Sequence, residues 1–304
     1  MRPGMMNKIP TDDRQWLHVR SWLLPSAQQA QSRGVIVLVH GLGEHLGRYV
    51  ILASFLNQLG WNVVGCDLRG HGVSEGKRGV LIGADNYLTD LAQLLDSIGE
   101  ELPGPRVLLG HSMGGVIAAR FVAEALEPVP ALWSRKVDAL VLSSPALDPG
   151  LSFVQKMLLA TVGRIAPHSA RGNGIKPKWI SRQRSVVSGY QRDRLVHDRI
   201  SPRLARFIID SGRFVQARAP RWSLPTLLLW AGADRVVAPR GSAAFAQAAP
   251  PNVVQAQEFP KLYHEIFNEP ERAEVMAHLV SWLRRFEPKP ATPATPATPA
   301  TSAS

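Results

Sequence analysis

The residues with the clearest chemical meaning are G-H-S-M-G-G at 110–115, which set Ser112 among glycines. An apolar run precedes them and a helical pattern follows, so the chain turns here from a strand into a helix. A turn this sharp brings backbone and Cβ atoms into collision, which Gly110 and Gly114 relieve. It also strains the serine and exposes its hydroxyl beside the free N–H of Met113, which can stabilise an oxyanion. The pattern therefore predicts a nucleophilic serine.

A serine hydroxyl is a weak nucleophile until a base removes its proton, so an acid and a histidine are expected downstream, in the order Ser, Asp, His. Asp234 follows the apolar segment T-L-L-L-W, and His264 follows V-V-Q-A-Q-E-F. Both positions lie just past predicted strands, where a turn directs side chains toward the serine. Asp148 follows the preceding apolar segment and competes with Asp234 as the acid. His111 is expected to point away from the serine.

The elements that must position these residues are strands that alternate with helices, which predicts a parallel sheet covered on both faces. The predicted strands are 14–24, 35–39, 61–66, 106–110, 137–143, 226–230 and 253–259. The predicted helices lie near 48–59, 85–101, 113–126, 240–249 and 271–286. The first strand alternates polar and apolar residues, as a half-exposed antiparallel strand does.

About 80 residues between the two runs of strands contain no clear apolar strand, which is too long for a simple loop. Helical spacing appears there in two sets of apolar residues: Leu151, Val154, Leu158, Val162 and Ile165, then Leu204, Phe207, Ile208 and Val215. We therefore expect a core of residues 1–147 and 222–287, interrupted by a helical cap at 148–221. Residues 288–304 are a Pro-Ala-Thr repeat with almost nothing to bury, and we expect a disordered tail.

The positive charge of the chain belongs to the cap. The net charge is +11, while residues 151–222 hold 15 Lys or Arg against three Asp. One interpretation is a protein that binds nucleic acid or an anionic surface, and another is solvated helix faces. Helical spacing sets Arg203, Arg206, Asp210 and Arg213 on one side of a helix, beside the apolar side formed by Leu204, Phe207, Ile208 and Val215. Such a helix could rest on an anionic lipid surface.

Several classes of protein are disfavoured by composition. Cys66 is the single cysteine, so an intramolecular disulfide is impossible and a cysteine-based zinc site is not expected. The chain has no H-E-x-x-H pattern, and Leu46 occupies the third glycine position of a dinucleotide loop, so neither metal nor dinucleotide is expected. No apolar run reaches the roughly 18 residues that span a bilayer, and the N-terminus lacks the apolar core of a signal peptide. We expect a cytoplasmic protein with peripheral membrane contact through the cap.

Five motifs in order carry a resemblance to a known group: 40–49 H-G-L-G-E-H-L-G-R-Y, 67–76 D-L-R-G-H-G-V-S-E-G, 110–115 G-H-S-M-G-G, 231–237 A-G-A-D-R-V-V and 263–269 Y-H-E-I-F-N-E. Together they resemble the monoacylglycerol lipase and lysophospholipase group of α/β-hydrolases. The resemblance implies an α/β-hydrolase fold with a cap. It implies Ser112 as nucleophile, His264 as general base and Asp234 as the orienting acid. The N–H groups of Leu42 and Met113 would form the oxyanion hole.

The resemblance also implies that Glu44 and Arg48 line the alcohol side of the pocket, while an internal salt bridge that shapes their loop is an equal alternative. The expected activity is hydrolysis of monoacylglycerols or lysophospholipids without a cofactor. A general carboxylesterase that acts on small soluble esters is the alternative. An aminopeptidase needs acidic groups to hold the substrate ammonium, and residues 151–222 have no Glu and only three Asp. The sequence leaves the oligomeric state open, and no nucleic-acid partner is expected.

Overall fold

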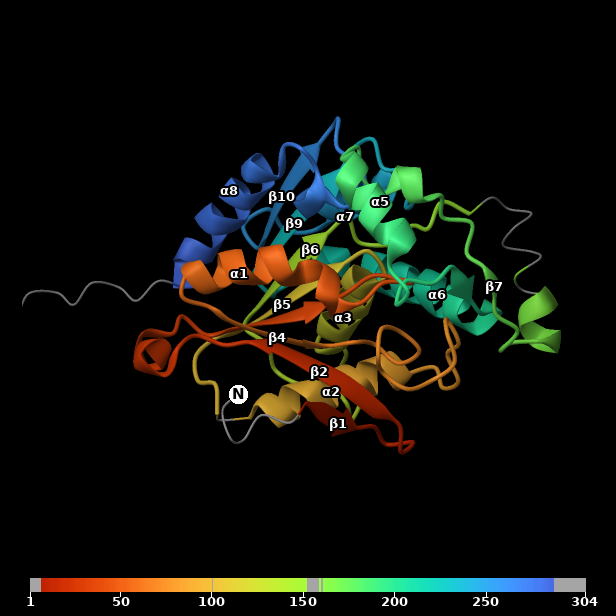
Figure 1. Cartoon of the computed structure of the whole chain (residues 1–304), viewed down its shortest axis with the longest axis horizontal. Coiled ribbons are helices and arrows are strands. Elements are labelled where there is room, and N and C mark those ends of the chain that lie inside the picture. The colour runs from red at the N-terminus through yellow and green to blue at the C-terminus, as the bar shows by residue number, and fades with distance from the viewer. Residues whose placement is uncertain (1–6, 100, 152–158, 160, 287–304) are drawn as a thin grey trace, which may run out of the picture.

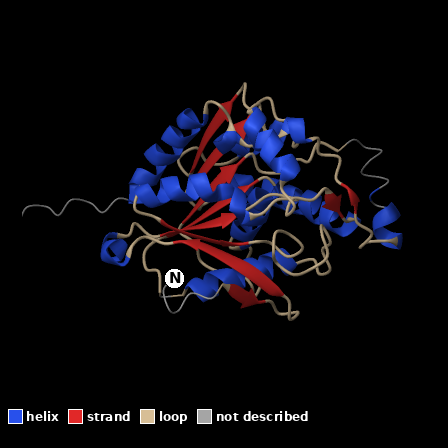
Figure 2. Ribbon diagram, viewed as in Figure 1, coloured by secondary structure: helices blue, strands red, loops and turns tan. Residues whose placement is uncertain are grey.

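A computed structural model describes residues 7–99, 101–151, 159 and 161–286. Within them an eight-stranded sheet has the order β1-β2-β4-β3-β5-β6-β9-β10 (Figures 1 and 2). The strands are β1 Lys8–Pro10, β2 Trp16–Trp22, β3 Val35–Val39, β4 Asn62–Cys66, β5 Arg106–His111, β6 Ala139–Ser143, β9 Thr226–Ala231 and β10 Val254–Phe259. The pairs β1–β2 and β2–β4 are antiparallel, and every other pair in this sheet is parallel.

Helices cover both faces of the sheet, as the sequence predicts. The α-helices are α1 Val50–Gln58, α2 Asn86–Ile98, α3 Met113–Glu124, α5 Arg184–Arg192, α6 Pro202–Arg218, α7 Pro239–Ala248 and α8 Arg272–Leu283. The short 3-10 helices are Ser26–Gln31, Leu46–Tyr49, Pro177–Trp179, Ala219–Arg221, Ile266–Asn268 and Arg284–Phe286. None of the helices in the described part of the chain has the length and apolarity needed to span a bilayer.

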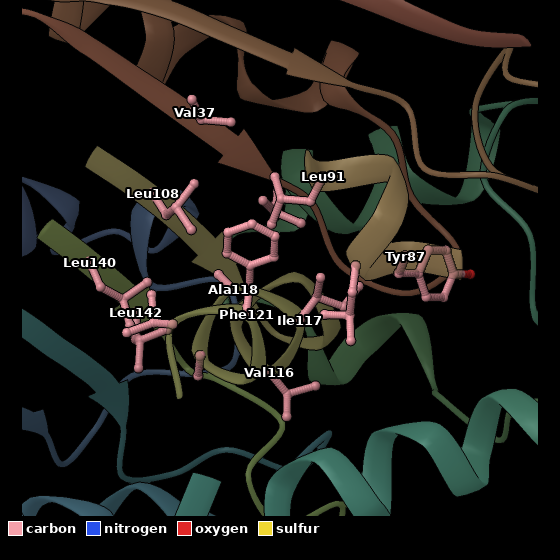
Figure 3. Close-up of a cluster of buried hydrophobic side chains, with 14 of the residues drawn as sticks. Val37, Tyr87, Leu91, Leu108, Val116, Ile117, Ala118, Phe121, Leu140 and Leu142 are labelled. Carbon is pink, nitrogen blue, oxygen red and sulfur yellow. The ribbon is translucent and has the colours of Figure 1, made fainter. Parts of the chain in front are cut away.

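The central strands are apolar throughout because both of their faces are covered. In β3, Val35, Val37 and Val39 belong to one buried cluster, together with side chains of α2, α3 and α7. Ile36 and Leu38 belong to a second cluster, together with side chains of α1 and α8. Figure 3 shows Phe121 of α3 among the aliphatic side chains of the first cluster. These two layers fix the ends of the strands, where the polar residues of interest lie.

The cap region between β6 and β9 gathers at one side of the sheet, to the right in Figure 1. It contains α5, α6 and a short antiparallel pair that the sequence reading missed, β7 Arg171–Gly172 with β8 Arg199–Ile200. Two-residue strands carry no recognisable alternation, so no pattern marks them. Two of the residues whose spacing predicts the first cap helix, Val154 and Leu158, lie outside the described part of the chain. The predicted tail at 288–304 also lies outside it.

Helix α6 separates a basic from an apolar side, as predicted, but its apolar side does not face solvent. Leu204, Ile208 and Val215 are buried in the same cluster as the side chains of α3. The side chains of Arg206 and Arg213 remain 61% and 69% exposed. The expectation that the apolar side rests on a lipid surface is therefore wrong, because that side completes the protein core.

Candidate active site

Ser112 lies at the turn between β5 and α3, where the sequence predicts a strained serine. Its φ is 54° and its ψ is −119°, a conformation that side-chain-bearing residues rarely adopt. A Cβ on Gly110 would lie 2.4 Å from the Gly114 carbonyl oxygen, and one on Gly114 would lie 2.0 Å from the Val39 carbonyl oxygen. Both glycines are therefore required, the first by the turn itself and the second by contact with β3.

Two backbone N–H groups beside Ser112 are free to act as donors. Met113 is the first residue of α3, and Leu42 follows β3 in the loop at 40–46. Within the described residues neither N–H has a hydrogen-bond partner. Both residues line the same cavity as Ser112. Unpaired donors at a helix N-terminus are suited to stabilise an oxyanion.

His264 and Asp234 form a buried pair. Nδ1 of His264 is 2.7 Å from Oδ2 of Asp234, and the side chains are 5% and 1% exposed. The other oxygen, Oδ1, accepts the N–H groups of Val236 and Val237 at 2.8 and 3.1 Å. Because a carboxylate only accepts, Nδ1 of His264 must carry a proton, which leaves Nε2 as the acceptor of the neutral ring.

The surroundings of His264 alter its basicity. Burial disfavours the charged ring, but the charge and hydrogen bond of Asp234, followed by the charges of Glu265 and Glu44, outweigh burial and raise its pKa above 6.5. A raised pKa makes the imidazole a better proton acceptor once it is neutral. His264 also lines a small cavity together with Ser112.

Asp148, the competing acid, is engaged elsewhere. Its Oδ2 accepts a hydrogen bond from Nε of Arg240 at 2.7 Å, and its side chain is 27% exposed. Its Oδ1 accepts the N–H of Gly150 at 2.8 Å. Of the two acids that the sequence left open, the structure brings Asp234 to the histidine.

His111 does not point away from the site, which corrects the expectation from sequence. Its ring lies against that of His264, with centroids 4.7 Å apart, and it lines the small cavity beside Ser112. Nδ1 of His111 contacts the carbonyl oxygen and the hydroxyl of Ser143, both at 3.1 Å. Burial, followed by the charge of His264, lowers its pKa to about 3, so this ring stays neutral. His111 ends β5, and the strained backbone of Ser112 that follows it interrupts the regular alternation of the strand.

Glu44 and Arg48 form an internal salt bridge, which is one of the two roles that the sequence left open for them. Arg48 Nη1 lies 2.6 Å from Glu44 Oε2 and 2.7 Å from Glu265 Oε1. Both residues also line the small cavity with Ser112. Burial raises the pKa of Glu44, but the charge of Arg48, acting together with the nearby histidines and the hydrogen bond from Tyr49, lowers it to about 2. Glu265 was missed, although its place directly after His264 was the available signal.

Ser112 lies between two unequal cavities. The larger, about 560 Å³, is lined mainly by apolar side chains of the core and cap, including Leu42, Ala146, Leu159, Val162, Ile200 and Val237. The smaller, about 20 Å³, brings together His111, His264, Glu44, Arg48, Glu265 and Tyr190, beside apolar residues such as Ile175, Ile180 and Val236. Among the described residues no group of three or more His, Cys, Asp or Glu side chains is arranged to hold a metal ion. The site therefore offers an apolar channel on one side of Ser112 and a charged recess on the other.

Comparison with known proteins agrees with this geometry. The family model described as Hydrolase_4, serine aminopeptidase S33, matches residues 30–271. A monoacylglycerol lipase of Mycolicibacterium smegmatis is 34% identical over 83% of this chain and 88% of its own. An uncharacterized abhydrolase domain-containing protein of Dictyostelium discoideum is 29% identical over 92% of this chain, which spans 29% of that longer protein.

Among solved structures, the monoacylglycerol lipase of Paleococcus ferrophilus superimposes with a TM-score of 0.77. It is 34% identical, and the match covers 89% of this chain and 99% of that one. The group that the five motifs resemble is thus confirmed, as is the predicted fold of a mostly parallel sheet flanked by helices. The chain belongs to the serine aminopeptidase S33 family, Hydrolase_4, and is an α/β-hydrolase of the serine type.

Proposed function

We propose that this protein hydrolyses monoacylglycerols through an acyl-Ser112 intermediate. The observation that carries the proposal is the position of the strained Ser112 between a large apolar cavity and the recess that contains His264 paired with Asp234. The nucleic-acid-binding alternative explains only the charge of the cap and leaves this arrangement without a role. The serine hydrolase proposal accounts for both cavities.

In the proposed reaction the base and the oxyanion donors act in both acylation and deacylation. Nε2 of His264 takes the proton of Ser112 as its oxygen attacks the ester carbonyl, and the N–H groups of Leu42 and Met113 stabilise the oxyanion. The intermediate collapses, the C–O bond to the alcohol breaks, and His264 returns the proton to the leaving alcohol. Water then attacks the acyl-Ser112 ester while His264 takes its proton, and His264 returns that proton to the Ser112 oxygen as the C–O bond breaks and the fatty acid leaves. Asp234 keeps the imidazole oriented and stabilises its charged form.

The unequal cavities support a placement of the two halves of the substrate. We place the acyl chain in the apolar cavity of about 560 Å³ and the alcohol at the mouth of the charged recess. That recess is only about 20 Å³ and holds two carboxylates, Glu44 and Glu265, against the single guanidinium of Arg48. A phosphate-bearing alcohol would bring a further negative charge to this recess, where charge repulsion is strong because the groups are buried. Glycerol carries no charge, which favours monoacylglycerols over lysophospholipids.

We expect kcat/KM for a monoacylglycerol to exceed that for the lysophospholipid with the same acyl chain by about tenfold or more, equivalent to at least about 1.4 kcal/mol. The measurement is fatty-acid release from matched decanoyl substrates, beside nitrophenyl esters of short and long chain and leucine nitroanilide. Equal rates on both decanoyl lipids would contradict the placement of the alcohol. A preference for acetyl over decanoyl esters would favour the small-ester alternative, and amide cleavage would favour an aminopeptidase.

We also propose that the cap makes peripheral contact with anionic membranes. Cap residues line the large cavity, and Arg206, Arg213 and the 81% exposed Ile165 lie on the solvent side of the same cap. Asp210 neutralises little of this charge, since its ion pairs at 3.2 and 3.9 Å are exposed. Each basic residue near an anionic surface contributes ~1 kcal/mol. The apolar side of α6 takes no part, so electrostatic attraction dominates.

Replacing Arg203, Arg206 and Arg213 with Gln should therefore weaken binding to anionic vesicles and reduce its salt dependence, while hydrolysis of a short soluble ester stays unchanged. Vesicle co-sedimentation at low and moderate salt measures the first effect. The matched control replaces Lys261, Arg272 and Arg284, which are exposed and lie outside the cap in sequence, and removes the same charge. If both triple variants sediment alike, the cap arginines are only solvated charge.

A further inference from the structure

One buried arginine connects the two loops that carry the proposed oxyanion donor and the proposed base. Arg48, in the turn at Leu46–Tyr49, donates through Nη1 to Glu44 Oε2 at 2.6 Å and Glu265 Oε1 at 2.7 Å. Its Nη2 donates to Glu265 Oε2 at 2.8 Å. The three side chains are 11%, 6% and 6% exposed. Two carboxylates from distant parts of the sequence are thereby held by one planar group.

Glu44 connects this arginine to the loop of Leu42. Its Oε1 accepts the backbone N–H of Gly41 at 2.7 Å and the hydroxyl of Tyr49 at 2.6 Å. The loop is packed closely at this point, since a Cβ on Gly41 would lie 2.9 Å from Glu44 Oε1 and 3.2 Å from Ser112 Cβ. The carboxylate therefore fixes the peptide that precedes the N–H of Leu42, directly beside the nucleophile.

Glu265 connects the same arginine to the histidine loop. It follows His264 in sequence, and its own N–H donates to the Ile180 carbonyl of the cap at 2.8 Å. Its Oε2 also accepts a hydrogen bond from Asn268 at 2.9 Å. The side chain and the backbone of the residue next to His264 are thus both held.

We infer that Arg48 is a positioning residue. It holds the Leu42 N–H and the His264 imidazole in the correct positions relative to Ser112. The inference rests on the proposed serine hydrolase mechanism. Three of the five N–H donors of Arg48 already serve the two carboxylates, and the Tyr190 ring lies 4.8 Å from its guanidinium carbon. Burying three charges contributes little net stability, because desolvation offsets the attraction. Fixed geometry is the benefit such a network supplies, and a misplacement of about 1 Å can cost about 10²-fold in rate.

Positioning and alcohol binding make different demands on kinetics. The alcohol has already departed when water attacks the acyl-enzyme, so a residue that only binds alcohol has no part in deacylation. The oxyanion donor and the base act in both half-reactions. Loss of a positioning residue should therefore slow every ester of one acyl chain to the same extent, whatever its alcohol, and should slow deacylation too.

The experiment compares Arg48→Lys and Glu265→Gln with the parent on decanoyl glycerol, decanoyl methyl ester and decanoyl nitrophenyl ester. Rates are expressed per site titrated with a fluorophosphonate, so that unfolded protein is not counted. We expect kcat to fall about 10²-fold for Arg48→Lys, equally on all three esters and in single-turnover deacylation, with KM less affected. Glu265→Gln keeps the shape of the side chain and should give a smaller loss of the same uniform kind. It covers the case in which Arg48→Lys does not fold.

The matched control is Arg69→Lys, because Arg69 is a buried arginine that also bridges two carboxylates, those of Asp90 and Asp13. It should lower the melting temperature and leave kcat per titrated site unchanged. Losses confined to the glycerol ester, or deacylation at the parent rate, would overturn the positioning role and return Arg48 to alcohol binding. A parent enzyme that neither reacts with fluorophosphonate nor cleaves any ester would instead refute the proposed function itself.

Discussion

Ser112→Ala should lower kcat for ester hydrolysis by about 10⁶-fold while the protein stays folded, since catalysis would then rest on binding and the oxyanion hole alone. The fold should survive because alanine has the same Cβ as serine and is therefore strained to the same extent at φ 54°. The serine side chain also makes no capping hydrogen bond to α3. The measurements are nitrophenyl ester turnover, fluorophosphonate labelling and the melting temperature.

Ser144→Ala is the matched control. Ser144 is another buried serine with positive φ, 40°, and its hydroxyl accepts the N–H of Ala231 at 3.3 Å. Its removal should cost about 1–3 kcal/mol of stability, because a buried donor loses its partner, but should leave turnover intact. Turnover by Ser112→Ala close to that of the parent would remove Ser112 as the nucleophile.

The sequence was most informative where a structural requirement is local. The apolar run of β3 and the glycines around Ser112 are recognisable because burial on two faces and a sharp turn each act on neighbouring residues. A Cβ on Gly114 nevertheless meets the carbonyl of Val39, a contact between α3 and β3 that the turn alone does not reveal. The local pattern identified Gly114 as important, but only the fold shows fully why a glycine is required there.

Long-range pairing is where the sequence fell short. Asp148 and Asp234 both follow strands at the same edge of the sheet, so their positions alone could not show which one meets His264. Glu265 escaped notice because its partner Arg48 is 217 residues earlier in the chain. The sequence suggested a lipid surface for the apolar side of α6 because amphipathic spacing predicts that one side of a helix is buried. The spacing does not indicate whether protein or lipid covers that side.

Asp234→Asn should lower kcat by about 10⁴-fold, because the amide can donate to Nδ1 of His264 and so favour the wrong tautomer. The change should also appear in the pH profile. His264 must be neutral to accept the Ser112 proton, and Asp234 contributes to raising its pKa, so the acid limb of kcat/KM for the parent should lie at higher pH than for an unperturbed histidine. Removing the negative charge of Asp234 lowers that pKa, so the limb of the variant should move to lower pH even as the plateau falls.

Asp148→Asn provides the control at the neighbouring strand end. It weakens the partly exposed pair with Arg240, so the stability cost should be small, and neither kcat nor the acid limb should change. Both variants are measured as kcat/KM against pH on a soluble ester, with fluorophosphonate titration to count active sites. The opposite ranking, with Asp148→Asn severe and Asp234→Asn mild, would show that the acid in solution is not the one paired with His264 here. A severe loss of kcat/KM in both variants would mean that each carboxylate is needed to maintain the geometry of its loop. Asp234 would then not act by stabilising the charged imidazole of His264.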